Sequence, residues 1–292
     1  MMVDQRPSMT WTRDSRIVTR QIKYGATTKY GDRIRRIMRK DAHTIKSTKT
    51  TVDILETIQV QKGATLTEVA EEIDLTRSTV HDYLQTLVSA GYLIKEDKRY
   101  NISLKLLDMG YHAKVKQTEW ELVRPALREI GDETGEHAWF VVEENGKVVY
   151  VDNYSGRRVI SLLNRPGTRH HIHCTAAGKA ILANLPEERV EEILKKHGLP
   201  AYTERTLTNR SDLLSELEEI RESGVAFADG EWTERIRAVA SPVIRDEEVI
   251  GAVTLGAPTK RLSGSYFHNE LPQLVTGAVS RLEISFRDEP FL

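Results

Sequence analysis

The sequence has a cluster of histidine and cysteine residues at His170, His171, His173 and Cys174. Such side chains could ligate a metal or carry out nucleophilic catalysis. Imidazole and thiolate are ligands that zinc accepts, and a cysteine beside a histidine can be a nucleophile with its base. Neighbouring side chains on a strand point to opposite faces, so only two or three of the four could meet at one ion. No acidic residue stands at a spacing that would orient the histidine. We therefore predict no catalytic residue, no metal site and no cofactor, with zinc binding as the alternative.

A second group of polar side chains suits the recognition of DNA. Arg77 is the best candidate to read a base, because its guanidinium can donate to both acceptors on the edge of a guanine. Lys98 and Arg99 suit the neighbouring phosphates. The candidate DNA-binding residues are Thr76, Arg77, Ser78, Thr79, His81, Tyr83, Lys98 and Arg99.

The elements that would position these side chains are two short helices and a hairpin within residues 64 to 102. Thr67 is expected to cap a first helix, and Thr76 to cap a second one, since a hydroxyl can accept from the free N–H groups of a first turn. The second helix has its apolar residues on one face, and Gly91 follows it where a left-handed residue ends a helix. Residues 92–94 and 100–102 then form a hairpin. This order is typical of a winged helix-turn-helix, which inserts its second helix into the major groove. A small packing unit or a protein-docking module would show the same pattern.

The charge is distributed unevenly along the chain. The 292 residues include 42 Lys or Arg and 43 Asp or Glu. Residues 1 to 44 hold eleven Lys or Arg against four Asp or Glu, whereas residues 45 to 112 hold eight against ten. DNA-binding domains are usually basic. The acidic excess of residues 45 to 112 therefore argues against a simple electrostatic attraction of this segment to DNA. We expect residues 1–45 to be a basic, disordered extension, either an arm that lies along phosphates or an upstream extension without function.

The composition places the chain among ordinary globular proteins. At 292 residues with 39% hydrophobic residues, two domains are expected. The sequence has no secretory leader and no apolar run long enough for a membrane span, so we expect no membrane partner. The single cysteine excludes an internal disulfide, which fits a cytoplasmic protein.

The rest of the chain predicts an α+β domain. Helices are expected at residues 103–115 and 120–133, then a hairpin around Asn145-Gly146 and a third strand at 159–163. Further helices are expected at 175–185, 186–197, 211–223 and 269–286, with strands at 225–228, 236–244 and 249–257. The domain boundaries that follow are 1–45 for the extension, 46–112 for the winged helix-turn-helix, and 113–292 for a linker helix and a second domain.

Over about residues 46 to 288 the chain resembles the IclR family of transcriptional regulators. The similarity rests on the order and spacing of several segments rather than on one motif. They include Leu66-Thr67-Glu68-Val69-Ala70, Arg77-Ser78-Thr79-Val80, Gly91-Tyr92-Leu93, His173 to Ala183, Asp229-Gly230-Glu231 and Ala240-Ser241-Pro242-Val243.

The resemblance implies a winged-helix DNA reader joined by a helix to a GAF-like effector-binding domain, in a homodimer or homotetramer. A small molecule would change its affinity for double-stranded DNA. Alanine and glycine at a helix start leave N–H groups accessible, which suits a carboxylate, so an organic acid is the expected effector. Close helix–sheet packing needs small residues too. The implied effector-binding residues are Leu163, Thr175, Ala176, Ala177, Gly178, Asp229, Glu231, Ala238, Ala240, Thr254 and Gly256.

The sequence departs from the family pattern at three positions. Asp82 stands where members often carry a basic residue, and we expect it to pair with Arg77 or His81, or to accept from a cytosine. Arg235 and Ala238 stand where many members have Gly and Cys, so contacts of that cysteine cannot be transferred. The sequence thus predicts an effector-modulated transcription regulator, not an enzyme. The alternative is a metabolite-sensing or metabolic α+β protein without a DNA operator.

Overall fold

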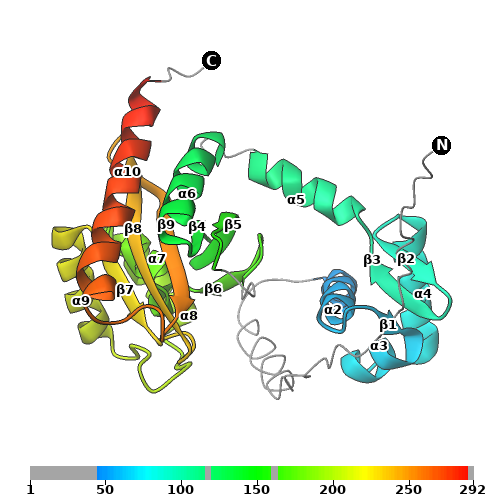
Figure 1. Ribbon diagram of the computed structural model, residues 1–292. Helices are drawn as coiled ribbons and strands as arrows, with labels where there is room; N and C mark the ends of the chain where they lie inside the picture. The colour runs from blue at the N-terminus through cyan, green and yellow to red at the C-terminus, as the bar shows by residue number, and fades with distance from the viewer. Residues whose placement is uncertain (1–44, 116–119, 159–163, 289–292) are drawn as a thin grey trace, which may run out of the picture. The chain divides into compact units, whose positions relative to one another are not determined.

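The structure, a computed structural model, describes residues 45–115, 120–158 and 164–288 (Figure 1). The predicted basic extension, apart from residue 45, and the predicted strand at 159–163 lie outside the described residues.

The first part of the chain is a winged helix-turn-helix. Its three-stranded antiparallel sheet has the order β1-β3-β2, and ten buried residues from the helices and strands form its core. The elements are α2 (Lys46–Val60), β1 (Ala64–Thr65), α3 (Leu66–Ile73), α4 (Arg77–Ser89), β2 (Leu93–Glu96), β3 (Arg99–Ile102) and α5 (Lys105–Val115). The sequence prediction did not include α2, whose Ile54 and Ile58 are completely buried.

Short-range hydrogen bonds explain where these helices begin and end. Thr65, not Thr67, caps α3: its hydroxyl accepts from the N–H of Glu68, and the Glu68 carboxylate accepts from the N–H of Thr65. This reciprocal pair satisfies two free donors, and Thr67 offers no such pair. The prediction for α4 is confirmed, because Thr76 accepts from the N–H of Thr79. Gly91 has a φ of +78° and lets the chain turn at the end of α4, as expected.

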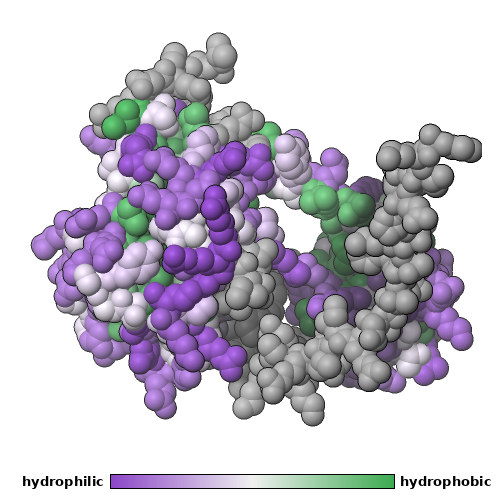
Figure 2. Space-filling model, viewed as in Figure 1, coloured by the Kyte–Doolittle hydropathy of each residue, from purple (hydrophilic) through white to green (hydrophobic). Residues whose placement is uncertain are grey.

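Helix α5 buries none of its side chains among the described residues. Leu107 is 67% exposed and Tyr111 is 56% exposed, and Val115 lies one further turn along the same helix. Figure 2 shows apolar surface on this segment. An apolar helix face without a packing partner is typical of an interaction surface.

The second part is a six-stranded antiparallel sheet with helices on both faces. The strand order is β6-β5-β4-β9-β8-β7. The strands are β4 (His137–Glu144), β5 (Lys147–Ser155), β6 (Arg169–His171), β7 (Ala226–Asp229), β8 (Ile236–Arg245) and β9 (Glu248–Pro258). The helices are α6 (Trp120–Thr134), η1 (Ile172–Cys174), α7 (Ala176–Leu182), α8 (Glu187–His197), α9 (Arg210–Ser223), η2 (Tyr266–Glu270) and α10 (Leu271–Asp288). The prediction of an α+β fold is confirmed.

The alternation of side chains along the strands produces two separate cores. On β4, Ala138 and Phe140 pack with α6 and α10, whereas Trp139 and Val141 pack with α7, α8 and α9 (Figure 1). Successive side chains of a strand point to opposite faces, so one strand serves both cores.

The predicted hairpin at Asn145-Gly146 is confirmed, and both residues have the positive φ that a two-residue type I′ turn requires. Asp246 and Glu247 join β8 to β9 in the same way. Among the described residues, no helix is both long enough and apolar enough to span a membrane.

Candidate functional site

The outer face of α4 presents the side chains that the sequence predicts for DNA reading. Val80, Leu84 and Leu87 face the core, which leaves the opposite side of the helix to solvent. Arg77, Ser78 and His81 are exposed there. Among the described residues, the Arg77 guanidinium has no acidic or carbonyl partner, so it can bind a base edge without first losing an internal contact.

The other predicted residues of α4 have partly internal roles. The Thr76 hydroxyl caps the helix and lies 2.9 Å from the Thr79 hydroxyl. Tyr83 is half-buried against the core of the winged helix. His81 Nδ1 lies 3.6 Å from the Asp82 carboxylate, so Asp82 pairs with one of its two expected partners. Gln85 was missed by the prediction. It is exposed one turn after His81, and this spacing of four places it on the same face.

The two wing cations that the sequence predicts to contact DNA, Lys98 and Arg99, differ in their contacts. Lys98 is exposed in the turn between β2 and β3. Arg99 donates to the carbonyl of Gly63 at 2.5 Å and lies 3.5 Å from the Glu68 carboxylate. Arg99 was predicted to contact phosphate, but these contacts engage its guanidinium in holding the wing to the start of α3.

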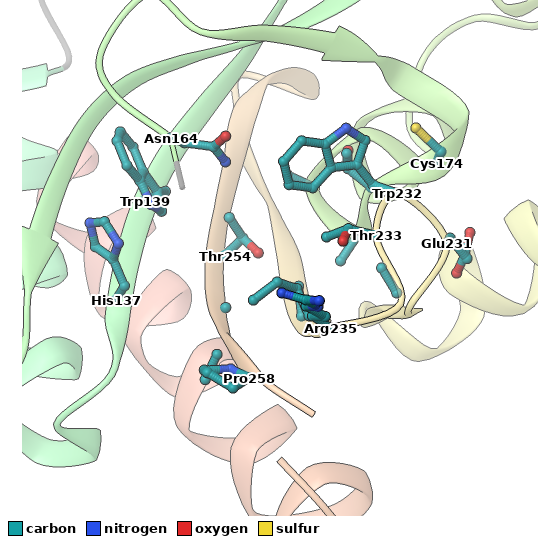
Figure 3. A pocket seen from close by; sticks show the side chains of 18 of the residues that line it. His137, Trp139, Asn164, Cys174, Glu231, Trp232, Thr233, Arg235, Thr254 and Pro258 are labelled. Carbon is teal, nitrogen blue, oxygen red and sulfur yellow. The ribbon is translucent and has the colours of Figure 1, made fainter. Parts of the chain in front are cut away.

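The second part contains a cavity of about 370 Å³ between the sheet and the start of α7 (Figure 3). The register of the sheet brings Trp139 opposite Thr254 and His137 opposite Gly256. Ala238 pairs with Gly256 on the other side, so one row of paired residues crosses three strands. The lining residues are His137, Trp139, Tyr150, Asn164, Cys174, Thr175, Ala176, Ala177, Ala228, Glu231, Trp232, Thr233, Arg235, Ile236, Ala238, Thr254, Gly256, Ala257, Pro258 and Arg261.

The cavity contains seven of the residues that the family resemblance implied: Thr175, Ala176, Ala177, Glu231, Ala238, Thr254 and Gly256. Leu163 lies outside the described residues. Gly178, Asp229 and Ala240 were expected in the site and do not line the cavity.

Local packing explains these three positions. A Cβ on Gly178 would lie 1.9 Å from the carbonyl oxygen of Ile172, so Gly178 allows close packing of the backbone. The Asp229 carboxylate forms two hydrogen bonds with Arg237, at 2.6 and 2.9 Å. Arg237 lowers the pKa of Asp229. Ala240 is fully buried in the core beneath α7.

One wall of the cavity is aromatic, which the sequence prediction missed. The rings of Trp139 and Tyr150 meet edge to face with centroids 5.2 Å apart. His170 does not line the cavity but packs against two lining residues, 5.5 Å from Tyr150 and 4.3 Å from Trp232. Burial lowers the pKa of His170 to about 4, so its ring is neutral at pH 7. The aromatic wall gives an apolar surface to a bound molecule.

A buried ion network lies beside the cavity. Lys179, only 1% exposed, donates to Glu216 at 2.5 Å and to Glu231 at 2.6 Å. Burial raises the pKa of Glu231, although Lys179 opposes this effect. The second oxygen of Glu231 is buried without a hydrogen-bond partner among the described residues. Since two carboxylates share one ammonium, the network is negative when both are ionised.

The His/Cys segment has internal contacts that differ from those of a metal or nucleophile site. The Cys174 thiol donates to the carbonyl of His171, and burial raises its pKa to about 12. Such a thiol is protonated at pH 7 and unreactive. His173 Nε2 lies 3.2 Å from the carbonyl of Pro200. Within the described part of the chain, no three His, Cys, Asp or Glu side chains are placed to hold one metal ion.

Both parts of the chain match known protein families. Residues 49–97 match the IclR helix-turn-helix domain, and residues 115–283 match the family described as bacterial transcriptional regulator IclR C-terminal. The chain is 29% identical over 259 residues to the HTH-type transcriptional regulator KdgR of Dickeya chrysanthemi, covering 86% of this chain and 84% of that protein. It is 29% identical over 227 residues to BhcR of Paracoccus denitrificans, covering 77% and 81%.

Two solved structures have the same fold. The IclR protein of Thermotoga maritima superimposes with a TM-score of 0.68 at 26% identity, over 83% of this chain and 99% of that one. An IclR homologue of Microbacterium hydrocarbonoxydans, solved with 4-hydroxybenzoate, superimposes with a TM-score of 0.69 at 22% identity, over 82% and 98%. The chain belongs to the IclR family of DNA-binding transcription regulators, with an N-terminal helix-turn-helix and a C-terminal effector-binding domain.

Proposed function

We propose that this regulator reads its operator with the exposed face of α4 and that a small anionic molecule in the 370 Å³ cavity changes its affinity for that operator. The cavity is the observation that carries the proposal. It lies between the sheet and α7, it is lined mainly by aromatic and small aliphatic side chains, and it contains few charged groups. Ligand sites in proteins have this composition and this size.

The DNA side of the proposal rests on Arg77, Ser78, His81 and Gln85, which share one exposed face of α4. A free guanidinium near the start of a recognition helix is placed to bind guanine, and Lys98 is placed to bind a phosphate. We propose no phosphate contact for Arg99, because its guanidinium holds the wing.

We also propose that the regulator works as a homodimer or a homotetramer in the cytoplasm. The exposed apolar side chains of α5 support self-association, since two copies of such a helix face would bury each other. Two copies would present two recognition helices to a symmetric operator.

Genome-wide occupancy of the tagged protein, with cells grown on different organic acids, tests this function. We expect a few sharp sites that share a sequence, with occupancy at some of them changed by one carbon source. Purified protein should then bind that DNA, and the same acid should change its affinity. Occupancy without any sequence preference would contradict the proposal.

A further inference from the structure

The charged groups around the cavity are divided between two sides. Figure 3 shows Glu231 and Cys174 on one side and Arg235 and Pro258 on another. Both charged residues come from the segment between β7 and β8, and both line the cavity. A ligand with one negative charge therefore meets two different electrostatic environments.

The side near α7 is unfavourable for an anion. Glu231 shares Lys179 with Glu216, and its second oxygen has no hydrogen-bond partner among the described residues. Helix α7 has only seven residues, and a helix N-terminus offers about half a positive charge at best. The Thr175 hydroxyl already accepts from the N–H of Gly178. A carboxylate placed there would face the buried Glu231 carboxylate, whose only ammonium among the described residues is shared with Glu216.

The Arg235 side has the opposite character. In the described part of the chain, no acidic side chain or carbonyl accepts from the Arg235 guanidinium. The other lining arginine, Arg261, lies 2.8 Å from the Glu136 carboxylate and donates to the carbonyl of Arg158. Arg235 is thus the cation that can turn all its donors toward a ligand, and a guanidinium binds a carboxylate through two parallel hydrogen bonds.

The body of the ligand must fit the walls between these two sides. Trp139 and Tyr150, whose rings are perpendicular, provide one aromatic face and one aromatic edge, and Ala176, Ala177 and Ala238 leave space in front of them. At ~30 Å³ per water, a cavity of about 370 Å³ has room for roughly a dozen non-hydrogen atoms. A two- or three-carbon acid would leave most of this space unfilled, whereas an aromatic ring would cover the wall.

We infer that Arg235 binds the carboxylate of the effector, and that the effector is an aryl carboxylate whose ring lies against Trp139 and Tyr150. This inference rests on the proposed function, because it assumes that the cavity is the effector site. It assigns the anion to the β7–β8 segment instead of the first turn of α7.

Calorimetric titration of the full-length protein with benzoate, benzamide and propionate tests the inference. Benzamide keeps the ring but has no charge, and propionate keeps the charge but has no ring. We expect benzoate to bind at least ten times more tightly than either one. Arg235→Gln should weaken benzoate about ten- to a hundredfold, the range for losing a charged hydrogen-bonded contact, and should leave benzamide within about twofold. Arg235→Lys should retain part of the benzoate affinity.

Lys260→Gln is the matched control, since it removes a neighbouring exposed charge that does not line the cavity. It should leave benzoate affinity within about twofold. Ala177→Leu, which fills the cavity, should abolish binding of every probe.

Two results would overturn the inference. If Ala177→Leu blocks benzoate but Arg235→Gln binds it normally, the cavity is the effector site and the carboxylate lies elsewhere in it. If neither benzoate nor benzamide binds the intact protein, the aryl class is wrong, and the response of the operator to other acids then decides the proposed function separately.

Discussion

The Lys179 ammonium lies 2.6 Å from the Glu231 carboxylate, and this buried contact ties helix α7 to the segment that carries Glu231 and Arg235. Glu216 on α9 completes the network. Charges removed from water in this way need their partners, because an isolated buried carboxylate is strongly unfavourable.

Replacement of Lys179 by Met should therefore destabilise the second part of the protein. Met fills a similar volume but leaves Glu216 and Glu231 facing each other without a cation. We expect the free energy of unfolding to fall by about 3 to 5 kcal/mol, the usual cost of breaking a buried pair. Urea denaturation measures this change. Arg210→Met is the control, because it removes one member of an exposed pair with Glu191 and should cost no more than about 1 kcal/mol. Equal losses in the two variants would contradict a special role for Lys179.

Three histidines predict how stability depends on pH. Burial lowers the pKa of His137, His170 and His173 to about 4 from an ordinary value of 6.5. Between pH 6.5 and 4 these histidines are therefore protonated in the unfolded chain and largely neutral in the folded chain. The stabilisation is fully present above pH 6.5 and is lost as the pH falls toward 4.

With three such groups, the free energy of unfolding should fall by up to about 4 kcal/mol per pH unit near pH 5. Urea denaturation at a series of pH values measures this slope. His170→Gln should lower the slope by about one third, because one of the three groups is removed. A slope that this variant leaves unchanged would show that His170 does not titrate as its burial indicates.

Replacement of Arg77 by Ala should weaken operator binding by roughly 1 to 3 kcal/mol and relax the preference at one base pair. The reason is the loss of a two-point contact with guanine that phosphate contacts cannot replace. Binding assays on the operator and on its single-base variants measure both effects. If affinity falls equally for the operator and for random DNA, Arg77 contacts phosphate and reads no base.

Lys98 and Arg99 of the wing should behave differently. Lys98→Ala should reduce the slope of log affinity against log salt by about 0.9, as expected for one lost phosphate contact. Arg99→Ala should leave this slope unchanged and lower the stability of the winged helix, because Arg99 binds Gly63 and Glu68. A reduced slope in Arg99→Ala would restore the original assignment of this residue to phosphate.

The sequence predicts those features that depend on local patterns. Thr76 and Gly91 mark the ends of α4 because a cap and a left-handed residue leave a signature within a few positions. The cap of α3 was misplaced by two residues, since Thr65 and Thr67 offer the same hydroxyl and only the position of Glu68 decides between them. The small residues of the cavity were predicted from the family resemblance, because their positions match the family pattern.

The aromatic wall and Arg235 could not be predicted in the same way. Trp139 belongs to an apolar run from 138 to 142 that is buried on both sides, so the pattern does not show which side faces a cavity. Tyr150 and Trp232 come from segments about 80 residues apart, and they line one cavity only because of the register of the sheet and the path of the β7–β8 segment. Helix α2 was missed because its sequence has a run of Ser and Thr at the start, without a side-chain cap.

The cavity itself can be tested by filling it from two opposite walls. Ala177 lies on α7 and is 1% exposed, and Ala177→Leu adds three carbon atoms toward the open space. Gly256 lies on β9, where the nearest atom to an added Cβ is 3.8 Å away, so the Cβ of Gly256→Val has room at the cavity. Both substitutions should block the effector and leave operator binding intact, because α4 belongs to a separate core.

The expected size of the effect follows from the coupling between the two ligands. An effector that changes operator affinity a hundredfold needs about 2.7 kcal/mol of differential binding between two states of the regulator. Filling the cavity removes the source of that energy. The variants should therefore bind operator, and the effector that changes the operator affinity of the parent protein should not change theirs. Thermal unfolding serves as the control for Ala177→Leu, since overpacking costs about 1 to 3 kcal/mol and a folded variant must still melt cooperatively. If calorimetry finds normal effector affinity in both variants, the effector binds outside this cavity and the alanines of α7 serve only to pack the helix against the sheet.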